Sequence, residues 1–290
     1  MSENILLLFN PIAGKGRSES VIQDLDQSFR EKGFKTFSAE VLDYIKNLHK
    51  AQPLTNFQAA VIAGGDGTIG SLLPLISNSE VPIYNIPTGN ESLFAREFCM
   101  KNNVSQIISL LEQKSYKTCF VPETNQMPFF SMVSVGFDSE VVSAIAENRT
   151  GAIGHRGYVL PTLKTSFSHK APITSLSVDG KKVISSEPGF TIVANCKQYA
   201  LSMPFLPEAN CESQELVARF FPYKGLPGYL LFNIRTLLGQ KDLPGSKFFR
   251  GEKFLIETQS PFPAQVDGDY LGNTPIELKT TENTIRVLAT

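Results

Sequence analysis

The stretch Ala59–Gly70, AAVIAGGDGTIG, carries the strongest structural signal in the chain. A short, continuously apolar run leads directly into glycines that surround one carboxylate, Asp66. Such a run is typical of a strand that is covered on both faces. Glycine loses more conformational freedom on folding than other residues, so this density indicates a backbone that turns tightly or approaches a ligand closely. A bound phosphate group and a plain turn are the two candidates.

Residues 65–70, GDGTIG, also match the G-x-G-x-x-G spacing of dinucleotide-binding turns. Two features argue against that interpretation. The motif follows the third predicted strand rather than the first, and Asp66 would repel a pyrophosphate unless a cation intervened or the side chain turned away. Asp66 is better explained as a partner of Mg²⁺ or of a hydroxyl group beside a nucleotide. A tight connection between a strand and a helix is the structural alternative.

Residues 1–124 alternate between short apolar runs and segments with helical spacing. This alternation predicts an α/β domain with a parallel, Rossmann-like sheet that is covered by helices. The predicted strands are 5–9, 34–42, 59–63, 81–86 and 116–121, and the predicted helices begin near 21, 43, 69 and 104.

Residues 125–290 show successive strand-like runs with few helical segments between them. The tetrapeptide Val178-Asp179-Gly180-Lys181 predicts a β-hairpin. We therefore expect a second domain, a mainly antiparallel β-sandwich, whose C-terminal end can pack back on the first domain. The cleft between two such domains is the default place for a ligand site. Helical patches are expected at 139–147, 156–169 and 226–239, and a strand at 284–288.

The composition limits the classes of function. A net charge of −1 without a long basic run argues against bulk electrostatic capture of nucleic acid. The 4 cysteines are widely spaced and the 3 histidines have no metal-ligand spacing, which argues against a structural zinc site or a disulfide framework. Because no segment is typical of a signal peptide or a membrane span, we expect a cytoplasmic protein that touches membranes only at their surface.

Two further loops are predicted at the same edge of the sheet. Asn10–Gly16, NPIAGKG, follows the first strand, and Pro87–Ser92, PTGNES, follows the fourth. The first loop lacks the spacing of a Walker A motif, but it can offer backbone amides and the cation of Lys15. Ligands of open α/β folds bind at the carboxyl ends of the strands. Each loop alone is explained equally well as a solvated connection, whereas three converging loops indicate a ligand site.

Together, these loops resemble those of the diacylglycerol kinase catalytic family, which includes sphingosine kinases and bacterial lipid kinases and shares its architecture with NAD kinase. The resemblance covers nearly the whole chain in the family's order. The matching segments are NPIAGKG at 10–16, GGDGT at 64–68 and IPTGNESLFAREF at 86–98, followed by VGFDSEV at 135–141 and QVDGD at 265–269.

This resemblance implies an ATP-dependent lipid kinase that transfers the γ-phosphoryl group of MgATP to a hydroxyl group of a diacylglycerol- or sphingoid-like lipid. The acceptor lipid would be presented at a membrane surface, and the reaction would take place between the two domains. Mg²⁺ is expected at Asp66 and Asp269. The formation of a homodimer is left as an open alternative. The implied ATP-binding residues are Asn10, Gly14, Lys15, Gly64, Gly65, Asp66, Gly67, Thr68, Gly89, Asn90 and Glu91.

The resemblance also implies a catalytic base. The family uses an aspartate followed by Gly-Glu to accept the proton of the lipid hydroxyl group, and the corresponding residue is Asp267, with Asp269 in place of the glutamate. Phosphoryl transfer needs positioning, charge neutralisation and such a base. The alternative is that residues 266–269 form only a hairpin turn, as is expected around Asp179. Composition does not separate these two turns.

Two departures from the family pattern leave other functions open. Leu93 stands at the last position of the family's Gly-Thr-Gly-Asn-Asp run, and Ser213 stands where a metal-organising aspartate is usual. Glu212 or Glu215 could substitute for the latter. One alternative is a nucleotide- or lipid-binding protein without catalysis.

The other alternative is a kinase of a soluble metabolite, like NAD kinase. The Asn10-Pro11 loop and the phenylalanine-rich second domain argue against this alternative, although apolar side chains more often form core. We also expect an apolar cluster in the second domain to form the cleft for the lipid acceptor. The cluster consists of Tyr199, Leu201, Met203, Phe205 and Leu206.

Overall fold

The computed structural model divides the chain into two compact units. The first comprises Met1–Val121 and Glu282–Thr290, and the second comprises Pro122–Thr281. The end of the chain therefore belongs to the first unit. The structure describes residues 4–89, 91–147, 171–198, 206–223, 235 and 245–290.

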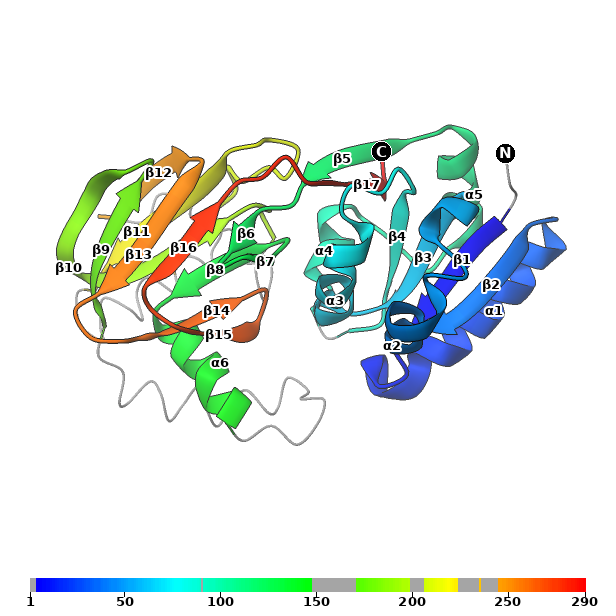
Figure 1. The fold of residues 1–290 in the computed structure, drawn as a ribbon, viewed down its shortest axis with the longest axis horizontal. Helices are drawn as coiled ribbons and strands as arrows, with labels where there is room; N and C mark the ends of the chain where they lie inside the picture. The colour runs from blue at the N-terminus through cyan, green and yellow to red at the C-terminus, as the bar shows by residue number, and fades with distance from the viewer. Residues whose placement is uncertain (1–3, 90, 148–170, 199–205, 224–234, 236–244) are drawn as a thin grey trace. The chain divides into compact units, whose positions relative to one another are not determined.

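The first unit is built on a six-stranded sheet with the order β2-β1-β3-β4-β17-β5 (Figure 1). Neighbouring strands are parallel except at the edge, where β5 runs antiparallel to β17. The predicted parallel α/β architecture is thus confirmed. The strands are β1 (Asn4–Phe9), β2 (Lys35–Glu40), β3 (Ala59–Gly64), β4 (Ile83–Pro87), β5 (Tyr116–Phe120) and β17 (Thr284–Leu288).

The central strands are apolar because both of their faces are covered. Every residue of β3 is buried, as are the four central residues of β1. Since β1, β3 and β4 run in the same direction, their carboxyl ends lie at one edge of the sheet. The loops that follow these strands are therefore brought together by the topology itself.

Helices connect these strands. Helix α1 (Arg17–Glu31) contacts β1, β2 and β3 and buries the apolar stripe Ile22, Leu25 and Phe29. Helix α3 (Asp66–Ile76) begins directly after β3, three residues earlier than the sequence pattern predicts. No helix in the described ranges is long and apolar enough to cross a membrane. The remaining elements are η1 (Ala13–Gly16), α2 (Val41–Asp43), the π-helical turn η2 (Tyr44–Leu48), η3 (Leu54–Asn56), α4 (Leu93–Glu97) and α5 (Val104–Glu112).

The second unit contains a large sheet whose strand pairs are all antiparallel, in agreement with the predicted fold class. The helix expected at 139–147 is α6 (Phe137–Glu147), whereas the patches expected at 156–169 and 226–239 lie outside the described residues except for residue 235. The strands are β6 (Glu123–Thr124), β7 (Met127–Pro128), β8 (Met132–Val135), β9 (Ile173–Val178), β10 (Lys181–Ala194), β11 (Leu216–Pro222), β12 (Lys247–Gly251), β13 (Lys253–Thr258), β14 (Pro263–Val266), β15 (Asp269–Asn273) and β16 (Ile276–Lys279).

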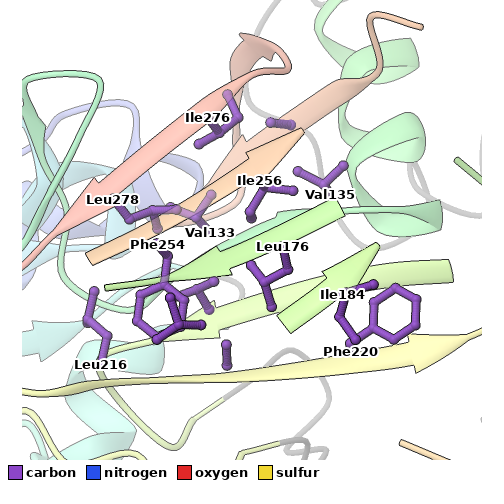
Figure 2. Packing of buried hydrophobic residues seen from close by; sticks show 14 of the residues in the cluster. Val133, Val135, Leu176, Ile184, Leu216, Phe220, Phe254, Ile256, Ile276 and Leu278 are labelled. Carbon is purple, nitrogen blue, oxygen red and sulfur yellow. The ribbon is translucent and has the colours of Figure 1, made fainter. Parts of the chain in front are cut away.

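The long strand β10 joins the two halves of this sheet. Its first part pairs with β9, and its last part, from Gly189 to Ala194, pairs with β11 and β8. The register shifts near Ile184, and such irregularities let a strand bend from one layer into another. The halves enclose one apolar core, in which side chains from β8, β9, β10, β11, β13 and β16 gather (Figure 2).

Strand β9 offers a matched test of this core. Leu176 is 0% exposed within the cluster, whereas Ile173 on the same strand is 40% exposed. We expect Leu176→Ala to lower the free energy of unfolding by about 2–5 kcal/mol, because it leaves a cavity. Ile173→Ala should cost less than about 1 kcal/mol. Urea unfolding followed by circular dichroism measures both values, and equal losses would contradict this description of the core.

Candidate functional site

The loop after β1 is tied to the loop after β3. The main-chain N–H of Asn10 donates to the carbonyl oxygen of Ala63 at 3.2 Å. The side chain of Asn10 donates from Nδ2 to Oγ1 of Thr68 at 3.1 Å. Thr68 is buried in the first turn of α3. Two of the predicted ATP-binding residues, one from each loop, are therefore in direct contact.

The loops after β3 and β4 touch through their glycines. A Cβ atom added to Gly65 would lie 3.2 Å from the Cα of Gly89, and one added to Gly89 would lie 2.7 Å from the Cα of Gly65. The main-chain N–H of Thr88 also donates to the carbonyl oxygen of Gly64 at 3.3 Å. Glycine is thus required at Gly89 because any side chain there would push the two backbones apart.

The first and third loops meet at Gly14. This residue has a φ of +60°, and a Cβ atom there would lie 2.5 Å from the carbonyl oxygen of Thr88. Beside this contact, the buried hydroxyl group of Ser18 is 2.9 Å from that of Thr88 and donates to the carbonyl oxygen of Ala13 at 3.1 Å. Sequence reasoning missed Ser18, because the first turn of α1 is entirely polar and gave no signal of this contact.

Asp66 links the loop after β3 to helix α4. Its Oδ1 accepts a hydrogen bond from the main-chain N–H of Phe94 at 2.9 Å, at the start of that helix. Burial raises the pKa of Asp66, while hydrogen bonds from the main chain of Phe94 and Leu93 and the charge of Arg96 lower it. The carboxylate of Asp66 therefore has a hydrogen-bond partner within the protein, the main chain in the first turn of α4.

Four further residues are predicted to bind the nucleotide, and the structure describes them to different extents. Lys15 lies in η1, and only its backbone is described. Gly67 is exposed in the first turn of α3, and Glu91 pairs with Arg96 at 2.8 Å. Asn90 lies outside the described residues.

Asp267 occupies the hairpin between β14 and β15 in the second unit. Its φ of +49° and the φ of +90° at Gly268 are typical of a two-residue hairpin turn. The carboxylate accepts three main-chain hydrogen bonds, from Phe130 at 2.8 Å, Ser131 at 2.8 Å and Met132 at 2.9 Å. These bonds fix the side chain against the segment that leads into β8.

The hairpin at Asp179 is built in the same way. Asp179 has a φ of +48°, and its Oδ1 accepts main-chain hydrogen bonds from Glu252 at 3.0 Å and Lys253 at 2.8 Å. The main-chain N–H of each aspartate also donates to the neighbouring segment, to Lys253 from Asp179 and to Met132 from Asp267. Both aspartates therefore anchor their hairpins to a neighbouring segment of the chain.

The remaining predicted features are only partly described. Asp269 is exposed at the start of β15. Of the apolar acceptor cluster, Leu206 is buried against Met132 and Ile192, and the other members lie outside the described residues. The described part of the chain contains no group of three or more His, Cys, Asp or Glu residues that could hold a metal ion.

The raised pKa of Asp66 predicts a pH dependence. Because the folded protein binds a proton at Asp66 more readily than the unfolded chain does, the free energy of unfolding should fall as the pH rises from the ordinary carboxyl pKa through the raised one. Asp66→Asn keeps an acceptor for Phe94 and removes the charge. We therefore measure the free energy of unfolding of both proteins in urea. The value for the wild type minus the value for Asp66→Asn should decrease across this pH range. A difference that increases with pH would contradict the assigned direction.

The chain is similar to known proteins in sequence and in fold. Residues 4–121 match the family model of the diacylglycerol kinase catalytic domain. A "Putative lipid kinase" of Staphylococcus carnosus is 20% identical, and the alignment covers 98% of this chain and 95% of that protein. An uncharacterized protein of Synechocystis sp. is also 20% identical, over 98% of this chain and 69% of its own length.

Among solved structures, the fold is similar to that of "A putative diacylglycerol kinase from Bacillus anthracis str. Sterne". The TM-score is 0.76, and the match covers 99% of this chain and 97% of that one at 18% identity. This likeness establishes the shared fold.

Proposed function

Since residues 4–121 match the family model of the diacylglycerol kinase catalytic domain, we propose that the protein transfers the γ-phosphoryl group of MgATP to a hydroxyl group of a diacylglycerol- or sphingoid-like lipid. The observation that carries the proposal is the meeting of three loops at one edge of the first sheet. These loops contact each other through Gly65 and Gly89, and through Asn10 and Thr68. The lipid kinase relatives support a lipid acceptor.

In this proposal the phosphates of ATP lie against the glycine-lined loops. The absence of side chains at Gly65 and Gly89 lets a ligand approach the backbone closely. The N-terminus of α3, an 11-residue helix, begins at the same place and favours negative charge. Arg17, whose Nε donates to the carbonyl oxygen of Gly14 at 3.1 Å, adds a cation beside the first loop.

Mg²⁺ enters the proposal as part of the substrate MgATP. Protein-bound Mg²⁺ commonly uses one or two carboxylates together with substrate phosphates, so a cage of protein ligands is not required. Of the two proposed contacts, Asp66 already accepts main-chain hydrogen bonds, and Asp269 is exposed. Asp66 therefore fits an anchoring role better than a metal-binding one.

Asp267 is the proposed base that accepts the proton of the lipid hydroxyl group. General-base catalysis requires a carboxylate in a fixed place, within hydrogen-bond reach of the reacting group. The three main-chain hydrogen bonds from residues 130–132 hold Asp267 in such a place. They leave part of the carboxylate's accepting capacity for the lipid hydroxyl group, because two ionised oxygens offer about four accepting positions.

A pair of identical substitutions tests the phosphate-binding loops. Gly65→Ala would place a methyl group against Gly89, whereas a Cβ atom at Gly70, in the helix that follows, meets nothing within 4 Å. We expect Gly65→Ala to weaken ATP binding roughly tenfold, the equivalent of about one hydrogen bond to a charged group. Gly70→Ala should leave the affinity unchanged. Isothermal titration calorimetry measures both, and equal affinities would argue against ATP binding at these loops.

A second pair of variants tests the proposed base. Asp267→Asn should lower kcat by roughly 10²-fold or more, with little change in ATP affinity, because it removes the base. Asp179→Asn changes the hairpin that is built in the same way and should leave kcat unchanged. The assay follows labelled phosphate from ATP into lipid in mixed micelles.

The melting temperatures of both variants have to be measured as well. In Asp267→Asn, the new amide group places a donor against at least one of the three main-chain donors around this side chain. In Asp179→Asn, the side-chain oxygen that remains can still accept both hydrogen bonds, because both are made to Oδ1. A folded Asp267→Asn variant with wild-type kcat would show that Asp267 is only a turn residue.

Nucleotide binding without transfer is a second candidate function. Leu93, at the position of a family carboxylate, is 9% exposed at the start of α4. The hydroxyl group of Ser213 accepts a hydrogen bond from the main chain of Glu215, whose own carboxylate pairs with Arg250 at 3.3 Å. A wild-type protein that binds ATP but labels no lipid would support this candidate. Equal transfer to a water-soluble acceptor would indicate a metabolite kinase.

A further inference from the structure

A chain of hydrogen bonds lies behind the hairpin of Asp267. It starts at Gln265, which is 4% exposed in β14 and pairs with Ser134 of β8 in the sheet register. Oε1 of Gln265 accepts a hydrogen bond from the main-chain N–H of Gly268 at 2.8 Å. Nε2 donates to Oγ of Ser134 at 2.8 Å, and that hydroxyl group donates to Oδ2 of Asp138 in the first turn of α6.

The direction of each bond in this chain is determined. The main-chain N–H of Gly268 can only donate, so the amide oxygen of Gln265 faces it, and the amide nitrogen must face Ser134. The hydroxyl group of Ser134 accepts from that nitrogen and donates to the carboxylate of Asp138. Reversing the amide would place its NH₂ group against the main-chain N–H of Gly268, so that two donors would face each other. The buried side chain of Gln265 would then lack an acceptor at this point.

These hydrogen bonds behind the turn distinguish the hairpin of Asp267 from that of Asp179. In the two turns, Gln265 and Ser177 occupy the corresponding position, three residues before the glycine. A serine side chain is too short to copy the contact that Gln265 makes with Gly268. The turn of Asp267 is thus held at two points, by its own carboxylate on residues 130–132 and by the glutamine behind it.

We propose that Gln265, oriented by Ser134 and Asp138, is a positioning residue that fixes the Asp267–Gly268 turn for phosphoryl transfer. The inference rests on the proposed function of Asp267. A base contributes only when it is held in a productive geometry, and a displacement of about 1 Å can cost on the order of 10²-fold in rate. A buried glutamine in a strand, whose amide accepts from Gly268 and donates to Ser134, provides such a support.

Gln265→Glu tests the proposal with almost no change in volume. The variant keeps an acceptor for Gly268, but it replaces the donor to Ser134 with a second carboxylate oxygen near Asp138. We expect kcat for lipid phosphorylation to fall by roughly 10- to 100-fold, with the KM for MgATP unchanged, because the turn moves while the nucleotide site in the first unit is untouched. Gln259→Glu, on the exposed surface of the second unit, is the control with the same change of charge.

A second measurement keeps folding and catalysis apart. In Gln265→Ala, hydrogen exchange at the Gly268 amide should accelerate, because its acceptor is gone, while exchange at Gly180 should not change. Unchanged exchange at Gly268 would overturn the inference, and so would a folded Gln265→Glu variant with wild-type kcat. A wild-type protein that transfers no phosphate would overturn the proposed function and the positioning role together, which separates that outcome from the other two.

Discussion

The parallel register between β3 and β4 is the constraint on which the candidate site depends. It pairs Gly64 with Pro87, so the two strands end together and their loops meet at Gly65 and Gly89. Strand β1 ends beside them, and the Asn10–Thr68 hydrogen bond closes the group. If β3 were shifted by one residue, each of its side chains, all of which are buried, would turn to the opposite face and lose the neighbours it packs against, so the core protects this register. The packing of apolar strands thus determines where the polar loops lie.

Much of this arrangement could be predicted from the sequence. The continuous apolar runs of β1 and β3 signal buried parallel strands, and the glycines mark the loops that must approach something closely. The sequence did not reveal that β17 inserts between β4 and β5, because residues 284–288 are far from both partners along the chain. Gln265 was equally hidden, since a polar residue in a strand normally indicates an exposed face.

The carboxylates show why residue type alone does not determine a role. Asp66, Asp179 and Asp267 all accept main-chain hydrogen bonds, and each fixes one backbone segment against another. The sequence alone therefore predicts a turn equally well at Asp179 and Asp267. What differs is the surrounding support, which for Asp267 includes the buried glutamine behind the turn. Positioning is a large part of phosphoryl-transfer catalysis, so such support is the feature to look for.

The central claim is that the loops after β1, β3 and β4 form one binding site for the phosphates of ATP. An NMR titration with a non-hydrolysable ATP analogue and Mg²⁺ tests it most directly, because the backbone amide of each loop is observed separately. Our account predicts that the amides of Asn10, Gly65 and Gly89 shift together with one dissociation constant, while that of Gly180 stays unchanged. Saturating shifts that leave Gly65 and Gly89 unaffected would contradict it.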